Sequence, residues 1–225
     1  MMLEYPSGKI TESSEGFEPS FPNYTNKFWT PIGLKLLADP VVTLCVLDFQ
    51  KYAKSPHSYS MFKSLVAVSN CHSDENTRIE RLSKLRRELS PGGEQGMKLP
   101  APLEPAGFIF HESRVGSTLA TNLLASDPSN MVFSESDPPA TVLLHFDEHD
   151  NQKEEKIALF RDIVLLMGRS TVHKRYFFKF QSITSTKMFI ALEVCVGFRS
   201  EGRGSAPFVT IGGQSDLSSL TSTFL

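Results

Sequence analysis

The sequence has little net charge, no long uninterrupted apolar run and no signal-peptide pattern at its start. Its formal net charge is −2, whereas nucleic-acid-binding domains are usually strongly basic, so we expect no nucleic-acid partner. The longest apolar stretch, residues 31–49, is interrupted by Lys35, Asp39 and Pro40, which makes it unsuited to span a bilayer. Residues 1–6 lack the basic and apolar regions of a signal peptide. We therefore expect a soluble, cytoplasmic protein with no membrane partner.

Cysteine is also scarce. The three cysteines are Cys45, Cys71 and Cys195, an odd number at wide spacing. This pattern predicts neither a metal-ligand pair nor a disulfide framework. We expect reduced, partly buried thiols and no bound metal.

The composition is that of an ordinary globular protein, because 40% of the 225 residues are hydrophobic and 21% are charged. A chain of this length can bury a sizeable core without covalent staples. One domain with flanking tails is the simplest organisation. The patterns divide the chain into a disordered N-terminal tail over residues 1–27, a mainly helical region over 28–96, an α/β domain over 97–196 and an irregular tail over 197–225.

The mainly helical region contains three segments with apolar character. Residues 32–37 predict a short helix that ends before Pro40. Residues 41–49 fit a strand or the start of a buried helix, because a short apolar run does not distinguish the two. Residues 74–90 predict an amphipathic helix, whose apolar stripe is Ile79, Leu82, Leu85 and Leu89.

The opposite face of that predicted helix is strongly basic. It carries Arg78, Arg81, Lys84, Arg86 and Arg87. Such a face is either an anion or acceptor surface or a solvated helix face, since charge on the exposed side of an amphipathic helix is common. Both interpretations remain open.

Strand and helix patterns alternate over the α/β domain. Short apolar runs at residues 108–110, 131–133 and 176–180 predict strands, and the stretches at 117–126, 153–167 and 185–196 predict helices, of which 153–167 is strongly amphipathic. Alternation of this kind indicates a parallel sheet flanked by helices. In the tail, residues 208–211 resemble a strand.

The connection between the first of these strands and its helix, residues 107–119, is the segment richest in chemistry. A tight loop that ends at a helix N-terminus directs backbone N–H groups at one point, which suits a phosphate. Gly116 permits close approach, and Ser117 and Thr118 add hydroxyl groups. Ser117 stands where a nucleoside-triphosphate loop requires lysine, which argues against an ATPase and disfavours a kinase with a degenerate loop.

The segment Ser113-Arg114-Val115-Gly116-Ser117-Thr118-Leu119 resembles the 5′-phosphosulfate-binding loop of P-loop sulfotransferases. Residues 127–130, 132–135 and 178–182 resemble the family's first connection, its second strand with a terminal glutamate, and a further strand. The resemblance covers roughly residues 106–195. It implies a parallel sheet like that of P-loop NTPases, flanked by helices and incomplete.

The resemblance also implies a function. The co-substrate is 3′-phosphoadenosine 5′-phosphosulfate, and its sulfuryl group passes to a hydroxyl or amine on a small molecule, a glycan or a peptide. Its 5′-phosphate is held by Ser113, Arg114, Val115, Gly116, Ser117 and Thr118. Arg114 stabilises charge on the leaving phosphate, and Glu135 takes the proton from the acceptor. No metal is required.

Several side chains near this loop have a structural alternative. Glu135 acts as a base, or it caps a loop or pairs with Arg114, because ion pairs also occur in clefts. His111 either acts as a base or bonds the backbone at the strand end, and we favour the second. Lys179 either lines the site or lies on an exposed strand face. His145 and His149 lie in an acidic loop and are expected to be solvated.

One part of the family pattern is absent. The family holds the 3′-phosphate with Arg and Ser around a third strand that precedes Arg-Asp-Pro, and no such segment follows residue 195. Arg199 and Ser200 are adjacent but lack that context. We therefore expect a sulfotransferase-like domain that is truncated at its C-terminus and impaired by this loss. The alternative is a non-catalytic module that binds phosphate or a nucleotide.

Overall fold

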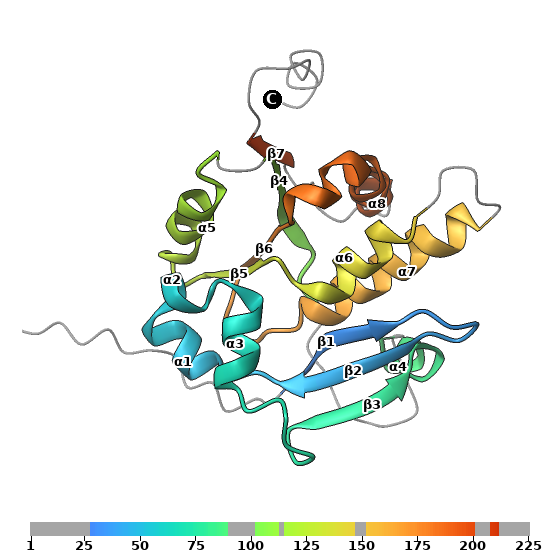
Figure 1. The fold of residues 1–225 in the computed structure, drawn as a ribbon, viewed down its shortest axis with the longest axis horizontal. Coiled ribbons are helices and arrows are strands. Elements are labelled where there is room, and N and C mark those ends of the chain that lie inside the picture. The colour runs from blue at the N-terminus through green and yellow to red at the C-terminus, as the bar shows by residue number, and fades with distance from the viewer. Residues whose placement is uncertain (1–27, 90–101, 113–114, 147–151, 201–207, 212–225) are drawn as a thin grey trace, which may run out of the picture.

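The computed structural model describes residues 28–89, 102–112, 115–146, 152–200 and 208–211. Figure 1 shows an α/β protein with two separate sheets, one parallel and one antiparallel. Helices α6 (Asp137–Leu144) and α7 (Lys153–Met167) lie between them. No helix in these ranges is long and apolar enough to cross a membrane.

The parallel sheet contains β4 (Pro105–His111), β5 (Asn130–Ser134), β6 (Arg175–Lys179) and β7 (Phe208–Ile211). Its strand order is β5-β6-β4-β7, and every neighbouring pair is parallel. The prediction of a parallel sheet flanked by helices is confirmed. The tail expected to be irregular supplies β7, because residues 208–211 pair with the free edge of β4.

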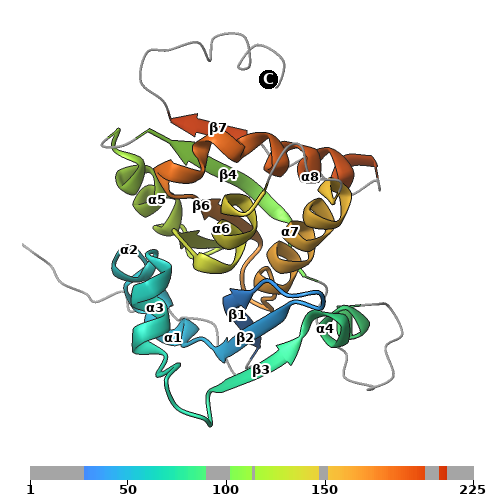
Figure 2. The ribbon, with the colours of Figure 1, turned by 45° about the vertical axis from the view of Figure 1, so that its right-hand side comes forward.

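Helices cover both faces of this sheet (Figures 1 and 2). One face carries α5 (Ser117–Ala125). The other carries α6, α7 and α8 (Met188–Ser200), with the 3-10 helix η1 (Ser182–Lys187) leading into α8. The predicted helices at 117–126 and 153–167 are confirmed almost to the residue, because both have a clear start and a clear end.

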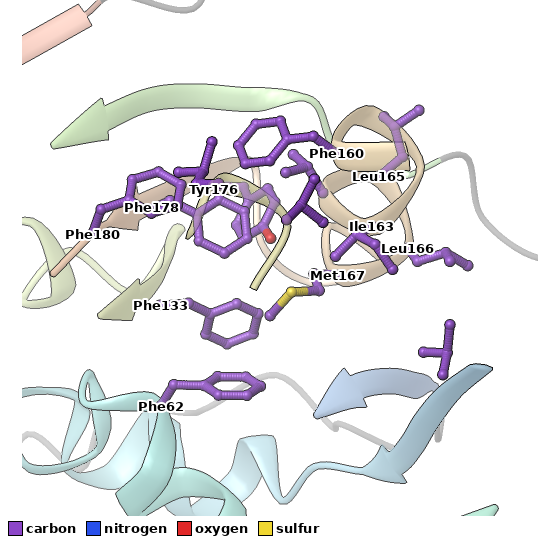
Figure 3. Packing of buried hydrophobic residues seen from close by; sticks show 14 of the residues in the cluster. Phe62, Phe133, Phe160, Ile163, Leu165, Leu166, Met167, Tyr176, Phe178 and Phe180 are labelled. Carbon is purple, nitrogen blue, oxygen red and sulfur yellow. The ribbon is translucent and has the colours of Figure 1, made fainter. Parts of the chain in front are cut away.

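Stacked aromatic rings build the core between the sheet and α7 (Figure 3). Phe108, Phe178 and Phe180 project from one face of the sheet onto Phe160 of α7, with ring centroids 5.8–6.1 Å apart. Some of these pairs are stacked and others tilted, and aromatic pairs at this spacing add to the stabilisation from burial of their apolar area. The residues that alternate with them along the strands therefore face α5.

The N-terminal region contains an antiparallel sheet that the sequence did not predict. Strands β1 (Trp29–Lys35), β2 (Val41–Val46) and β3 (Thr77–Arg81) pair in that order. Residues 41–46 form the predicted strand, but the predicted helix at 32–37 is wrong, because residues 32–35 belong to β1 and three of them pair with β2. The expectation of a mainly helical region is thus only partly right.

The amphipathic helix in this region is shorter than predicted. Residues 77–81 pair with β2, and α4 begins only at Leu82 and ends at Leu89. Ile79 is therefore 68% exposed on β3, whereas Leu82 and Leu85 are buried. The prediction that Ile79 lies on the apolar stripe of a helix is therefore wrong, because pairing with β2 overrides the local helical pattern.

Between β2 and β3 the chain forms α1 (Phe49–Lys54), α2 (Pro56–Tyr59) and α3 (Phe62–Val68). This excursion returns Cys71 to β2, where it forms a disulfide with Cys45 at a Cα–Cα distance of 5.6 Å. The expectation of reduced thiols is therefore wrong for these two residues. Sequence spacing could not reveal the pair, because the three helices bring it together.

One continuous core joins the two sides of the boundary expected near residue 96. Phe62 of α3 meets Phe133 of β5 with ring centroids 5.0 Å apart, as Figure 3 shows. Arg86 of α4 pairs with Asp162 of α7 at 2.5 Å. The N-terminal region and the parallel sheet therefore pack as one unit, although the boundary itself lies outside the described residues.

Candidate functional site

The carboxyl ends of the parallel strands meet at one edge of the sheet, where open α/β sheets bind their ligands. β4 ends at His111 and leads through the loop at residues 112–116 into α5. β5 ends at Ser134 and is followed by Glu135, and β6 ends at Lys179. The residues that the sequence singled out on three strands are thus brought to one edge.

The N-terminus of α5 supplies the turn that the sequence predicted to bind an anion. Gly116 has φ of 80°, a left-handed conformation that suits glycine. The N–H groups of Leu119 and Ala120 bond the carbonyl of Gly116, so they are the first donors used inside the helix. Those of Ser117 and Thr118 precede them and have no acceptor within the helix. With the positive end of the helix dipole, this turn can hold a phosphate or sulfate oxygen.

The remaining loop residues differ in how far the structure describes them. Val115 is half-buried, Ser117 is buried and Thr118 is exposed. Ser113 and Arg114 lie outside the described residues, so their predicted roles stay predictions. The described part of the loop has the strand–turn–helix form that the sequence predicted.

Glu135 and Lys179 form an ion pair at the same edge. The ammonium of Lys179 donates to the Glu135 carboxylate, and the Glu135 N–H donates to the Lys179 carbonyl at 2.7 Å. The Lys179 side chain is 2% exposed and that of Glu135 is 30% exposed. Glu135 also has φ of 61°, an unusual backbone conformation for a residue with a side chain. The pair is therefore held from both main chain and side chain.

Lys179 lies on the face of the parallel sheet that α5 covers. Its register partners are Ile109 on β4 and Ser134 on β5, which together form a row across the three strands. Two residues earlier, Val132 and Phe177 pack with Ala125 of α5. Because strand residues alternate between faces, the row lies on the face that α5 covers. Lys179 thus brings a buried positive charge to the α5 side of this edge.

Three buried polar atoms at this edge lack a hydrogen-bond partner among the described residues. They are Nε2 of His111 and the hydroxyls of Ser134 and Ser136. Buried polar groups are nearly always paired, so such atoms indicate a site for a ligand or for water. The hydroxyls can donate to an anion.

His111 also makes a backbone contact. Its Nδ1 lies 2.6 Å from the carbonyl of Glu112, which agrees with the preferred prediction of a strand-end histidine bonded to the backbone. Nδ1 acts as the donor in this contact, since a carbonyl oxygen only accepts. In the neutral ring, Nε2 then carries the lone pair.

The structure also bears on other residues whose role the sequence left undecided. His145 is exposed, as expected, and His149 lies outside the described residues. On the basic face, Arg78 stacks on Trp29 with 4.9 Å to the ring centroid, and Lys84 pairs with Glu80 at 2.8 Å. These internal contacts favour the interpretation of the basic face as a solvated surface.

No three histidine, cysteine, aspartate or glutamate side chains within the described ranges gather where they could hold a metal ion. Arg199 and Ser200 are the last two residues of α8, not the end of a strand.

The sequence did not identify the partner of Glu135. The signal was available, because Lys179 is the single charged residue in the run 176–180, which is otherwise aromatic. A buried charge in such a strand requires a counter-charge.

Comparisons of this chain with protein-family models, with curated proteins and with solved structures found no match.

Proposed function

We propose that this chain is a sulfotransferase-like protein that binds 3′-phosphoadenosine 5′-phosphosulfate and transfers its sulfuryl group to a hydroxyl or amine. The observation that carries the proposal is that the α5 N-terminus and the Glu135–Lys179 pair both lie at the carboxyl edge of the parallel sheet. A fold like that of P-loop NTPases is part of the proposal. It is supported by the parallel sheet and by the strand–turn–helix unit formed by β4, the loop and α5.

The residues at this edge fit the phosphosulfate end of the co-substrate. The N–H groups of Ser117 and Thr118 would hold the 5′-phosphate, and Arg114 would add positive charge and paired donors. The unpaired hydroxyls of Ser134 and Ser136 offer further donors for anionic oxygens. This combination suits a phosphate that carries a sulfuryl group.

Transfer needs a base and a stabilised leaving group. The Glu135 carboxylate takes the proton of the acceptor O–H or N–H as the acceptor atom bonds to sulfur. The bond between sulfur and the bridging oxygen breaks, and its electron pair goes to the 5′-phosphate of 3′-phosphoadenosine 5′-phosphate. Lys179 and Arg114 offset the charge that develops on the transferring and leaving groups.

A second function is favoured by the same ion pair. Because the carboxylate of Glu135 is already bonded to Lys179, it accepts a proton only when this bond is shared or broken. If the pair is structural, the chain is a non-catalytic module that binds phosphate or a nucleotide through α5.

Titration calorimetry with 3′-phosphoadenosine 5′-phosphate tests nucleotide binding, which the enzyme and the non-catalytic module would share. We expect saturable binding that is lost in Arg114→Ala and Gly116→Val and kept in Glu135→Gln. Absence of binding at millimolar nucleotide would contradict the sulfotransferase proposal. Binding of inorganic phosphate but not of the nucleotide would support a module that recognises only the phosphate group.

Transfer from radiolabelled co-substrate separates the enzyme from the module. Three probes represent the acceptor classes: 4-nitrophenol for aryl hydroxyls, N-acetylglucosamine for sugar hydroxyls and glucosamine for amines. Glu135→Gln should abolish transfer while it keeps nucleotide binding. Glu80→Gln is the matched control, because Glu80 also pairs with a lysine but lies on β3, away from the site. Binding without transfer to any probe would favour the module.

A further inference from the structure

The outer edge of the parallel sheet is covered by the segment that links β2 and β3. β5 is the outermost strand on this side, and its Val132 and Ser134 N–H groups point away from β6. Val132 donates to the hydroxyl of Tyr52 at 3.0 Å, and Ser134 donates to the carbonyl of Ser60 at 2.8 Å. Met61 adds a parallel bridge to Ser134. The α2–α3 junction thus reaches the carboxyl edge beside Glu135.

Ser60 makes a second bond, to the helix that carries the anion-binding turn. Its hydroxyl lies 3.1 Å from Oδ1 of Asn122 on α5. Ser60 is 1% exposed, so water has little access to replace either hydrogen bond. The contact holds for either orientation of the Asn122 amide, because a hydroxyl both donates and accepts.

We propose that Ser60 is a positioning residue that fixes the separation between Glu135 and the N-terminal turn of α5. The inference rests on the proposed sulfotransferase function. The Ser60 carbonyl holds the residue immediately before Glu135, and its side chain holds α5 five residues after Ser117. One residue therefore links the proposed base to the proposed phosphate site.

Each of the two linked elements is internally hydrogen-bonded, so a single hydroxyl between them can set their distance. Glu135 directly follows β5, and its N–H is bonded to the carbonyl of Lys179 on β6, so its position is tied to the ends of both strands. Asn122 and Ser117 belong to one continuous helix, so the turn follows Asn122. Transfer between bound groups is sensitive to such distances, since a displacement of about 1 Å can lower the rate by about 100-fold.

The test compares Ser60→Ala, Ser60→Thr, Asn122→Ala and the double variant Ser60→Ala/Asn122→Ala. Transfer is measured with whichever of 4-nitrophenol, N-acetylglucosamine and glucosamine reacts fastest with the unaltered protein. Ser60→Ala keeps the backbone bond to Ser134, so we expect it to fold. Its kcat should fall by about tenfold, a fraction of the loss that a full 1 Å displacement would cause. The KM for the co-substrate should change by less than about twofold, because the turn of α5 is intact.

Rescue and coupling distinguish positioning from a general loss of structure. Ser60→Thr keeps the hydroxyl and should restore kcat. Asn122→Ala should lower kcat as much as Ser60→Ala does. The double variant should lose no more kcat than either single variant, because both substitutions remove the same bond between Ser60 and Asn122. Ser58→Ala is the control, since Ser58 is an exposed serine on α2 that bonds Ser55.

Each remaining outcome overturns the inference in a recognisable way. An unchanged kcat in Ser60→Ala, with or without a lower melting temperature, assigns Ser60 a purely structural role. Equal falls in kcat for Ser60→Ala and Ser58→Ala do the same. If the unaltered protein binds no nucleotide or transfers to none of the probes, the proposed enzymatic function has failed, and the positioning role fails with it.

Discussion

The hydroxyl of Tyr52 on α1 accepts a hydrogen bond from the backbone N–H of Val132 on β5, at 3.0 Å and out of contact with water. An edge strand normally presents unpaired N–H groups, which promote pairing with other chains unless something covers them. Here a side chain from a distant helix supplies the missing acceptor. The excursion between β2 and β3 is therefore part of the sheet's edge.

Tyr52→Phe should destabilise the fold, because it leaves the Val132 N–H buried without an acceptor. A buried unsatisfied donor costs about 1–3 kcal/mol. Urea unfolding monitored by circular dichroism measures this loss. Tyr59→Phe on α2 is the matched control, since Tyr59 is only partly buried, and it should change the free energy of unfolding by less than about 0.5 kcal/mol. Equal effects in the two variants would contradict the prediction.

We expect the two partners of the Glu135–Lys179 pair to differ in how much their substitution lowers the free energy of unfolding. Glu135→Gln leaves the buried Lys179 ammonium without a counter-charge, which costs about 3–5 kcal/mol when a buried pair is broken. Lys179→Met leaves a partly exposed carboxylate that water can reach, so its cost should be smaller. The double variant should be more stable than Glu135→Gln alone. Chemical unfolding of the three variants checks this order, and equal losses in the two single variants would contradict it.

The Cys45–Cys71 disulfide should contribute substantially to stability. It closes a segment with a sequence separation of 26, for which chain entropy predicts about 3.5 kcal/mol. The comparison is between the oxidised protein and Cys45→Ala/Cys71→Ala in urea unfolding. Intact mass before and after alkylation under denaturing, non-reducing conditions gives the number of free thiols. Alkylation of Cys45 and Cys71 in unreduced protein would contradict the disulfide.

His173 predicts a loss of stability in mild acid. Burial against the rings of Phe49 and Tyr52 lowers the pKa of His173 from 6.5 to about 4. Between these values the unfolded chain binds a proton that the folded chain does not. The stabilising contribution is therefore complete above pH 6.5 and falls as the pH drops towards 4, by about 3 kcal/mol in total.

The free energy of unfolding of the unaltered protein and of His173→Gln, measured from pH 7.5 to 4, tests this dependence. The slope between pH 6.5 and 4 should be shallower in His173→Gln than in the unaltered protein. His145→Gln is the control, because His145 is exposed, and it should keep the original slope. Parallel curves for all three proteins would assign the acid sensitivity to other groups.

The sequence alone determined the elements whose patterns are local. The α7 helix was predictable from apolar residues that recur at helical spacing over 15 residues. The strand–turn–helix unit around Gly116 was predictable because glycine and hydroxyl residues follow an apolar run. Residues 208–211 could be recognised as strand-like, but their place beside β4 could not, because nothing local indicates which edge is free.

The tertiary structure decided every relationship between residues far apart in the chain. Cys45 meets Cys71, Glu135 meets Lys179 across 44 residues, and Ser60 meets Asn122 across 62. It also made residues 29–35 a strand, since pairing with β2 outweighs the weak preference of a short apolar run. Local spacing encodes which face of an element is apolar. Which elements then lie together depends on how all apolar faces are buried at once, and this placed Lys179 beside Glu135 and Ser60 next to the end of β5.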